Sequence, residues 1–307
     1  LSALEAETGF ILSNSPTQTV GFKVVSHLAK VPHPIPLLSL EKTKQINDAV
    51  SFIDIHPSML MLKLDGLTVE LDYENGVLQQ ASTRGDGDVG EDITHNIPAF
   101  KNVPIKIPYP DRLVIVGEAF IYKYDFEKMK ELLVDSSGKP YRNARNLASG
   151  SVRLLDAEEC SKRNIYFLPF SVLAGLDEKE EVANSKVEKL DELEPLGFGS
   201  CDRMIFQQPP TPDELEDCIG KLKKEAETKG LPIDGMVTTF NNIAYSKACG
   251  RTGHHFKDGL AFKFEDEMFD TVLKSIEWNP TRFGEIAPVA IFDTVEIDGC
   301  EVSRASL

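Results

Sequence analysis

The feature that most constrains the fold is a series of short alternating segments separated only by turn residues. The stretch Met59 to Asp65 places three leucines on one face of a strand, and Gly66 ends it. Residues 67–73 and 77–83 then flank Asn75-Gly76, a dipeptide typical of the two-residue type I′ turn. The sequence therefore predicts a half-buried strand followed directly by an antiparallel hairpin.

Helix and strand signals continue along the chain. A capping box at Thr211 to Glu214 predicts a helix that Gly230 ends, and helices are also expected over 41–52 and from a cap at Asp125 to Val134. Further strands are expected over 112–122, 165–173, 233–240 and 259–264. We divide the 307 residues into an irregular segment (1–36), a main domain (37–268) and a small β module (269–307).

The charge balance limits the partners that the whole surface can attract. The chain has 33 Lys and Arg against 49 Asp and Glu, a net charge of −16. Such a chain is not a general polyanion binder, so any contact with nucleic acid must come from a local basic surface. No apolar run approaches the length of a membrane span, and the first residues do not resemble a signal peptide. We therefore expect no membrane partner.

The cysteines indicate where the protein works. Five are scattered through the chain, at Cys160, Cys201, Cys218, Cys249 and Cys300. None forms the C-x₂-C spacing of a zinc finger or ribbon, so we expect no zinc within this chain. An odd number of scattered cysteines favours a reducing, cytoplasmic location.

Lys63-Leu64-Asp65-Gly66 is the sharpest chemical feature. A lysine and an aspartate two residues apart on a strand share one face. If that face is buried, the lysine pKa falls and the neutral amine becomes a nucleophile that the aspartate can orient. Taken alone, the tetrapeptide favours an ordinary strand end that carries a surface lysine, because such short patterns also arise by chance.

A glycine-rich acidic stretch follows the hairpin, from Thr83 to Asn96. Its glycines would let backbone N–H groups approach a phosphate closely, and Arg84 would add a fixed cation. The alternative is a structural acidic turn or a calcium loop. The stretch lacks the EF-hand spacing, so calcium is disfavoured.

More motifs follow in order, and together they resemble the nucleotidyltransferase (adenylation) domain of bacterial NAD-dependent DNA ligases. The matching segments are 15–21, 37–40, 63–66, 83–96, Gly117-Glu118, 143–156, Asp234-Gly235, Lys263 and 282–290. The last of them is similar to the first strands of the family's OB-fold. Several ordered motifs at near-native spacing are far more specific than any one of them.

The resemblance implies an α+β fold, in which antiparallel sheets with flanking helices form an ATP-grasp-like nucleotidyltransferase domain, followed by the start of an OB-fold. It implies a reaction in which Lys63 attacks the α-phosphorus of NAD and expels nicotinamide mononucleotide. AMP then passes from the lysine to the 5′-phosphate of a DNA nick, and the 3′-hydroxyl displaces AMP and seals the strand. The cofactors would be NAD and Mg²⁺, the partner nicked double-stranded DNA, and the state a monomer acting in DNA replication and repair.

The resemblance also implies roles for individual residues. Lys63 and Asp65 are the expected catalytic pair, and Arg145 and Arg153 are expected to meet DNA phosphates unless they form ordinary surface ion pairs. Glu118 is expected to hold ribose or metal. The remaining expected nucleotide contacts are Ser39, Leu40, Met61, Arg84, Phe170, Thr239 and Lys263, of which Lys263 neutralises the α-phosphate.

Four positions depart from the family pattern. Met61 stands where the family has a glutamate that contacts adenine, Val116 replaces an arginine, Phe170 replaces a stacking tyrosine, and Thr239 replaces a lysine read as a phosphate ligand. Loss of such a charged contact costs roughly 2–3 kcal/mol. The pocket is therefore either weakened at these points or rebuilt by neighbouring residues, and both readings stay open at this stage.

Two other functions compete with the leading one. A weakened pocket favours a catalytically impaired, ligase-like module that only binds nucleotide or DNA, although the retained Lys63 and Lys263 argue against it. An ATP-dependent ligase or RNA-capping relative would share the lysine motif but not the stretches 83–96 and 143–156. The family's helical segment for nicotinamide mononucleotide, its zinc finger, its helix-hairpin-helix module and its BRCT domain are not in this sequence, so we expect that this chain alone does not seal nicks.

Overall fold

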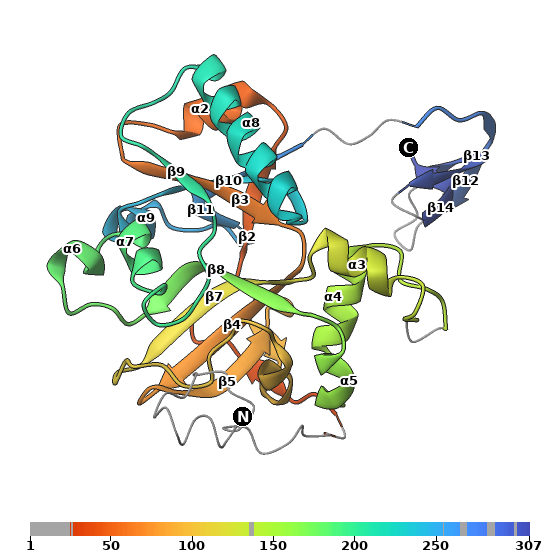
Figure 1. Ribbon diagram of the computed structural model, residues 1–307. Coiled ribbons are helices and arrows are strands. Elements are labelled where there is room, and N and C mark those ends of the chain that lie inside the picture. Colours follow the sequence, from red (N-terminus) through yellow and green to blue (C-terminus); the bar gives the residue numbers. More distant parts are fainter. Residues whose placement is uncertain are drawn as a thin grey trace.

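The computed structural model describes residue 25 and residues 27–134, 138–253, 255–264, 269–280, 286–297 and 300–307. The main body is built on two mostly antiparallel sheets that lie one above the other in Figure 1, with helices packed around them. The α+β fold class implied by the sequence is confirmed. The matching segment 15–21 and residues 282–285 lie outside the described residues.

The larger sheet has five strands in the order β2-β11-β10-β3-β9. Their bounds are Ser39–Thr43, His255–Lys263, Ile233–Phe240, Ser58–Leu64 and Arg203–Phe206. Neighbouring strands are antiparallel except β2, which runs parallel to β11. Helices α2 (Ile46–Phe52) and α8 (Pro212–Lys229) cover one face of this sheet (Figure 1).

The smaller sheet has four strands in the order β5-β4-β7-β8, all antiparallel. Their bounds are Val77–Thr83, Leu67–Glu74, Leu113–Phe120 and Tyr166–Ala174. A short ladder joins β1 (Lys30–Pro32) to β6 (Val89–Glu91), so the described part of the segment 1–36 is not wholly irregular.

The alternation of strand β3 decides where the two cores lie. Leu60, Leu62 and Leu64 pack with α2 and α8 on the outer face. Met59 and Met61 point the other way, into a core shared with the four-stranded sheet, and Lys63 continues that inner face. The β3 residues on the inner face are therefore apolar and enclosed at one end of the strand and charged at the other.

Short helices surround the sheets. They are η2 (Thr94–Ala99), α3 (Lys123–Met129), α4 (Ala144–Val152), α5 (Ala157–Ser161), α6 (Glu180–Ala183), α7 (Lys186–Asp191) and α9 (Ile243–Cys249). The last three strands, β12 (Leu273–Pro280), β13 (Ile286–Ile297) and β14 (Cys300–Ser306), form an antiparallel meander. Its assignment as the start of an OB-fold stays a prediction.

Most local expectations are confirmed, and two are wrong. The type I′ hairpin is present, with φ of 53° at Asn75 and 71° at Gly76, and α8 carries its capping box and ends at a left-handed Gly230. The helix expected over 41–52 begins only at Ile46, because the preceding residues are recruited into β2. Asp125 does not cap α3: it is buried inside that helix, which begins two residues earlier and ends at Met129 instead of Val134.

Candidate functional site

Three charged residues from three adjacent strands meet at the open end of the inner face. The strand register places Gly235 of β10 directly between Lys63 of β3 and Lys263 of β11. An irregularity in the pairing between Ile233 and Gly235 turns Asp234 toward both lysines. Its Oδ1 lies 2.9 Å from Lys63 Nζ and its Oδ2 lies 2.9 Å from Lys263 Nζ. We call these three residues the lysine cluster.

The lysine cluster corrects one expectation. Burial alone would raise the pKa of Asp234, but the hydrogen bonds and charges of Lys63 and Lys263 lower it, so the carboxylate stays ionised. The residue that orients Lys63 in this structure is therefore Asp234 and not Asp65. The sequence held the signal, since Asp234-Gly235 is one of the family motifs, but the distance of 171 residues from Lys63 gave no indication of the contact.

Asp65 instead binds an arginine of α4. Its Oδ1 lies 2.9 Å from Arg145 Nη1, in a pair that remains partly exposed. Gly66 follows, and its position explains why glycine is required there: a Cβ would stand 2.1 Å from the carbonyl oxygen of Ala119. The turn between β3 and β4 thus lies against β7, next to Glu118.

Glu118 lies beside this cluster and is the most perturbed carboxyl group of the site. It accepts a hydrogen bond of 3.0 Å from Thr68 Oγ1. Burial raises its pKa to about 7, although that hydrogen bond and the positive charges of Lys63 and Arg145 act in the opposite direction. Glu118 can therefore change its charge near neutral pH, which is typical of a group in a functional cleft.

The glycine-rich stretch forms a compact turn rather than a cradle. Asp86 Oδ1 accepts hydrogen bonds from the backbone N–H groups of Asp88 and Val89, and the N–H of Gly87 donates to the carbonyl of Arg84. These three amides are thus already satisfied within the turn, which fits the structural alternative. The group of this turn that could bind an anionic ligand is therefore the Arg84 side chain.

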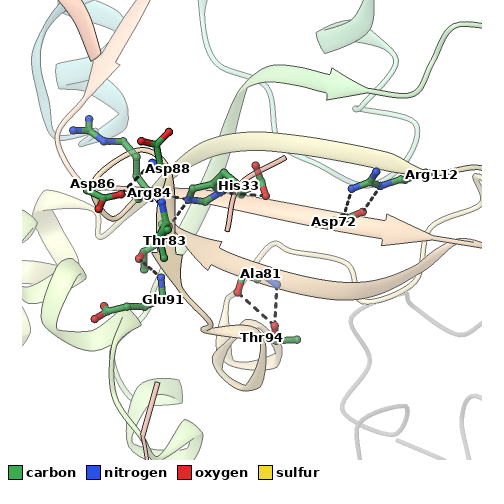
Figure 2. Close-up of polar contacts among 12 residues, drawn as sticks. His33, Asp72, Ala81, Thr83, Arg84, Asp86, Asp88, Glu91, Thr94 and Arg112 are labelled. Carbon is green, nitrogen blue, oxygen red and sulfur yellow. Dashed lines mark hydrogen bonds and ion pairs between the residues drawn. The ribbon is translucent and has the colours of Figure 1, made fainter. Parts of the chain in front are cut away.

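A buried histidine fixes this turn to the segment that precedes the main domain. Figure 2 shows the His33 ring at the carbonyls of Thr83 and Arg84, with Nε2 at 3.1 Å and 3.2 Å. The same view shows Thr94 bound to the backbone of Ala81 and Arg112 paired with Asp72. The His33 contact, together with the hydrogen bond from the Arg84 N–H to the carbonyl of Thr68, holds Arg84 at the end of β5.

The other end of the inner face contains the expected base contacts. Met61 is buried, and Phe170 of β8 packs at the edge of the same cluster. Leu40 of β2 lies over Gly259, whose partner across the sheet is Thr239. Val116 is buried within β7 and pairs with Ser171. Ser39 pairs with His255 at the edge of the sheet. The structure therefore gathers Leu40, Met61, Phe170 and Thr239 at one end.

The register corrects the reading of Thr239 as a phosphate position. Thr239 pairs with Met59, whereas Gly235 pairs with Lys63. Four strand residues separate the two positions, about 13 Å along the sheet. Met61 lies between them, so Thr239 belongs to the enclosed end of the face and not to the lysine cluster.

An unexpected cation stands at Thr239. Lys186, the first residue of α7, places its Nζ 2.6 Å from Thr239 Oγ1 and 2.6 Å from Asp258 Oδ2. The sequence showed that the lysine expected at 239 was missing, and the structure shows an ammonium group at that place from another element. No sequence motif singled out Lys186 or Asp258.

The two arginines expected to bind DNA lie at the ends of α4 and are both in ion pairs. Arg145 binds Asp65, and Arg153 Nε lies 3.0 Å from Glu91 Oε2. Eight residues separate them, about 12 Å along a helix. Their side chains are about half exposed, at 54% and 45%. The surface ion pairs that the sequence left as the alternative are therefore present in the free protein.

The described residues contain no group of three or more His, Cys, Asp or Glu side chains placed to hold a metal ion. A single carboxylate such as Glu118 is enough for Mg²⁺, which is commonly bound by one or two carboxylates together with water and substrate phosphates. Within the same residues no helix is both long and apolar enough to pass through a bilayer.

Comparison with known proteins shows what the whole chain is similar to. The family model described as NAD-dependent DNA ligase adenylation domain matches residues 25–267. DNA ligases of Lachnoclostridium phytofermentans and Ruminiclostridium cellulolyticum are each 41% identical over 307 residues, which are 100% of this chain and 46% of theirs. A DNA ligase of Bacillus pumilus is 37% identical over 96% of this chain and 45% of its own. The chain thus spans about half the length of these curated relatives.

Proposed function

The chain belongs to the family of NAD-dependent DNA ligase adenylation domains, and from this premise we propose that it carries AMP on Lys63 for the sealing of nicked DNA. The supporting observation is the lysine cluster, in which Asp234 of β10 holds two ammonium groups from the strands on either side of it. In this proposal Lys63 reacts, and Lys263 neutralises the phosphate on which it reacts.

In the proposed first step, the deprotonated Nζ of Lys63 attacks the α-phosphorus of NAD. A P–N bond forms, the P–O bond to nicotinamide mononucleotide breaks, and the electron pair leaves with the mononucleotide phosphate. Asp234 is the nearest acceptor for the proton that Lys63 must lose, at 2.9 Å. Lys263 neutralises charge on the phosphoryl oxygens as the bond breaks.

Neighbouring residues position the nucleotide. Arg84 and Glu118 both bind Thr68 beside the cluster. The Arg84 N–H donates to the Thr68 carbonyl, and the Thr68 hydroxyl donates to the Glu118 carboxylate. Glu118 would hold Mg²⁺ together with phosphate oxygens, and the ion would supply further charge neutralisation when bound. Leu40, Met61 and Phe170 would cover the adenine base with apolar surface.

In the later steps AMP passes to the 5′-phosphate of a nick, and the 3′-hydroxyl displaces it. Arg145 and Arg153 would exchange Asp65 and Glu91 for DNA phosphates, because a guanidinium binds either anion through the same paired donors. We place this reaction in the cytoplasm, where DNA is available and where Cys160, Cys201, Cys218 and Cys249 remain free thiols. We expect the protein to act as a monomer.

Intact-mass measurement of the purified chain with NAD and Mg²⁺ tests the proposal. We expect one AMP adduct, which peptide mapping places on Lys63 and which Lys63→Ala removes. Lys162→Met is the matched control, since Lys162 is an exposed lysine paired with Glu159 on α5. An adduct on another residue, or its absence together with failure to bind AMP in calorimetry, contradicts the proposal.

A further inference from the structure

Lys186 is unusual because it is a nearly enclosed lysine aimed at the inner face of the sheet. Its side chain is 19% exposed, and so is that of its partner Asp258. Burial lowers the pKa of Lys186, while Asp258 acts in the opposite direction. Thr239, to which it also donates, is 8% exposed. The proposed adenylation chemistry gives this arrangement no role.

The position of this pair on the sheet points to the base of the nucleotide. Lys63, Met61 and Met59 alternate along one face of β3, and their partners on β10 are Gly235, Val237 and Thr239. A nucleotide whose phosphate lies at the lysine cluster can extend along this face past Met61. Its far edge then approaches Thr239, and with it Lys186.

The pair also offers the complementary hydrogen-bonding groups that an adenine edge needs. An ammonium group has three donors, and two of them are used by Thr239 and Asp258. One donor remains for a ring nitrogen. Asp258 binds Lys186 through Oδ2, and its second oxygen, Oδ1, is the atom that would accept from an exocyclic amine.

The pair is electrically neutral, which suits a base rather than a phosphate. One ammonium and one carboxylate cancel, whereas the lysine cluster has two ammonium groups and one carboxylate. A neutral heterocycle gains from a fixed donor and acceptor without requiring a surplus of charge.

We propose that Lys186 and Asp258 form an adenine-reading pair, in which the Lys186 ammonium donates to N1 of the base and Asp258 accepts from its 6-amino group. The proposal rests on the proposed function, because the phosphate must be anchored at the lysine cluster. Lys186 is then the specificity residue of the pocket, supplied by a helix and not by the sheet itself.

The test compares binding of AMP and IMP by calorimetry on the full chain. IMP carries a carbonyl at position 6 and a proton on N1, so both hydrogen-bonding groups are reversed. We expect the wild type to prefer AMP by about 10- to 100-fold, because the wrong base leaves buried polar groups unpaired. Lys186→Met should weaken AMP binding by a similar factor and remove most of the preference.

Two companion variants separate recognition from folding. Lys186→Met with Asp258→Asn removes both charges, so no unpaired carboxylate is left to unfold the chain. Lys186→Met with Thr239→Lys returns an ammonium group to the same place from β10, and we expect it to restore part of the AMP affinity. Lys162→Met is again the control and should bind both nucleotides as the wild type does.

The outcomes distinguish this inference from the function on which it rests. If AMP binding depends on Lys263 but Lys186→Met keeps both the affinity and the preference, the adenine-reading pair is wrong and the proposed function stands. If the wild type prefers IMP, or binds both equally, the pair is likewise refuted. If the wild type binds neither nucleotide, both the proposed function and this inference are refuted.

Discussion

The two ends of the inner sheet face both combine lysine with aspartate, but they differ in net charge. At the open end, Asp234 holds Lys63 and Lys263, and two positive charges face one negative charge. At the enclosed end, Asp258 holds Lys186, and the charges cancel. The first arrangement leaves a surplus positive charge for an anion. The second leaves a neutral donor and acceptor.

The construction of the two ends differs as much as their charge. The open end is made by three neighbouring strands, so its geometry follows from the sheet register. The enclosed end receives its cation from α7, which binds back to the sheet through the Lys186 N–H and the Asn241 carbonyl. We infer that a pocket can lose a charged residue on a strand without losing the charge, if a nearby helix supplies it.

The largest expected effect on binding is the change in nucleotide affinity, and it distinguishes the two ends by comparing AMP with adenosine. Lys263→Met should weaken binding of AMP by about 2–3 kcal/mol and leave adenosine binding nearly unchanged, because it removes a charge-assisted contact to phosphate alone. Lys186→Met should weaken AMP and adenosine equally. Calorimetry with both ligands on both variants provides the measurement. Equal losses of AMP and adenosine in Lys263→Met would mean that the two ends are not distinct.

The next effect concerns the carboxyl beside the open end and depends on pH. The pKa of Glu118 is raised in the folded protein from 4.5 to about 7, so the folded state holds this proton more tightly than the unfolded state. The group therefore costs stability progressively as pH rises from about 4.5 to 7, and the cost is constant above that window. Because the difference between these two pKa values corresponds to roughly 3 kcal/mol, Glu118→Gln should stabilise the chain by about that amount at pH 8 and by almost nothing at pH 4.

Denaturant unfolding of both proteins at several pH values measures this difference. A matched control is Glu159→Gln, because Glu159 is an exposed carboxyl on α5. A gain for Glu118→Gln that does not change between pH 4 and pH 8 would show that folding does not raise the Glu118 pKa, so that this carboxyl is ionised at neutral pH. The open end would then carry one more permanent negative charge than the comparison assumes.

The smallest effect lies at α4, outside both ends. Arg145→Ala and Arg153→Ala each break a half-exposed ion pair, so the free energy of unfolding should change by less than about 1 kcal/mol. Binding to nicked duplex DNA should weaken, and the dependence of its log affinity on log salt should fall by about 1 for each arginine. Titrations at three salt concentrations provide the check. Unchanged DNA affinity would assign these arginines to the free protein's ion pairs alone.

Local sequence signals predicted a large part of the fold. The hairpin at Asn75-Gly76 and the helix from Thr211 to Gly230 were correct because a dipeptide turn and a capping box act within a few residues. The expected helix start at residue 41 was wrong: the helix begins at Ile46, because the residues before it form β2, which pairs with β11 more than 200 residues away. The cap at Asp125 was wrong because this carboxylate is buried inside α3.

The sequence by itself determined which residue types the site has. Lys63, Asp234 and Lys263 could be quoted from motifs because each motif is contiguous, and the departures at Met61 and Thr239 could be read in the same way. Only the tertiary structure decided which partner each residue has. Asp234 and not Asp65 holds Lys63, and Lys186 supplies the charge at Thr239. The physical reason is that sheet register and helix docking bring together groups far apart in the chain, and a neighbour in space leaves no periodic trace in a sequence.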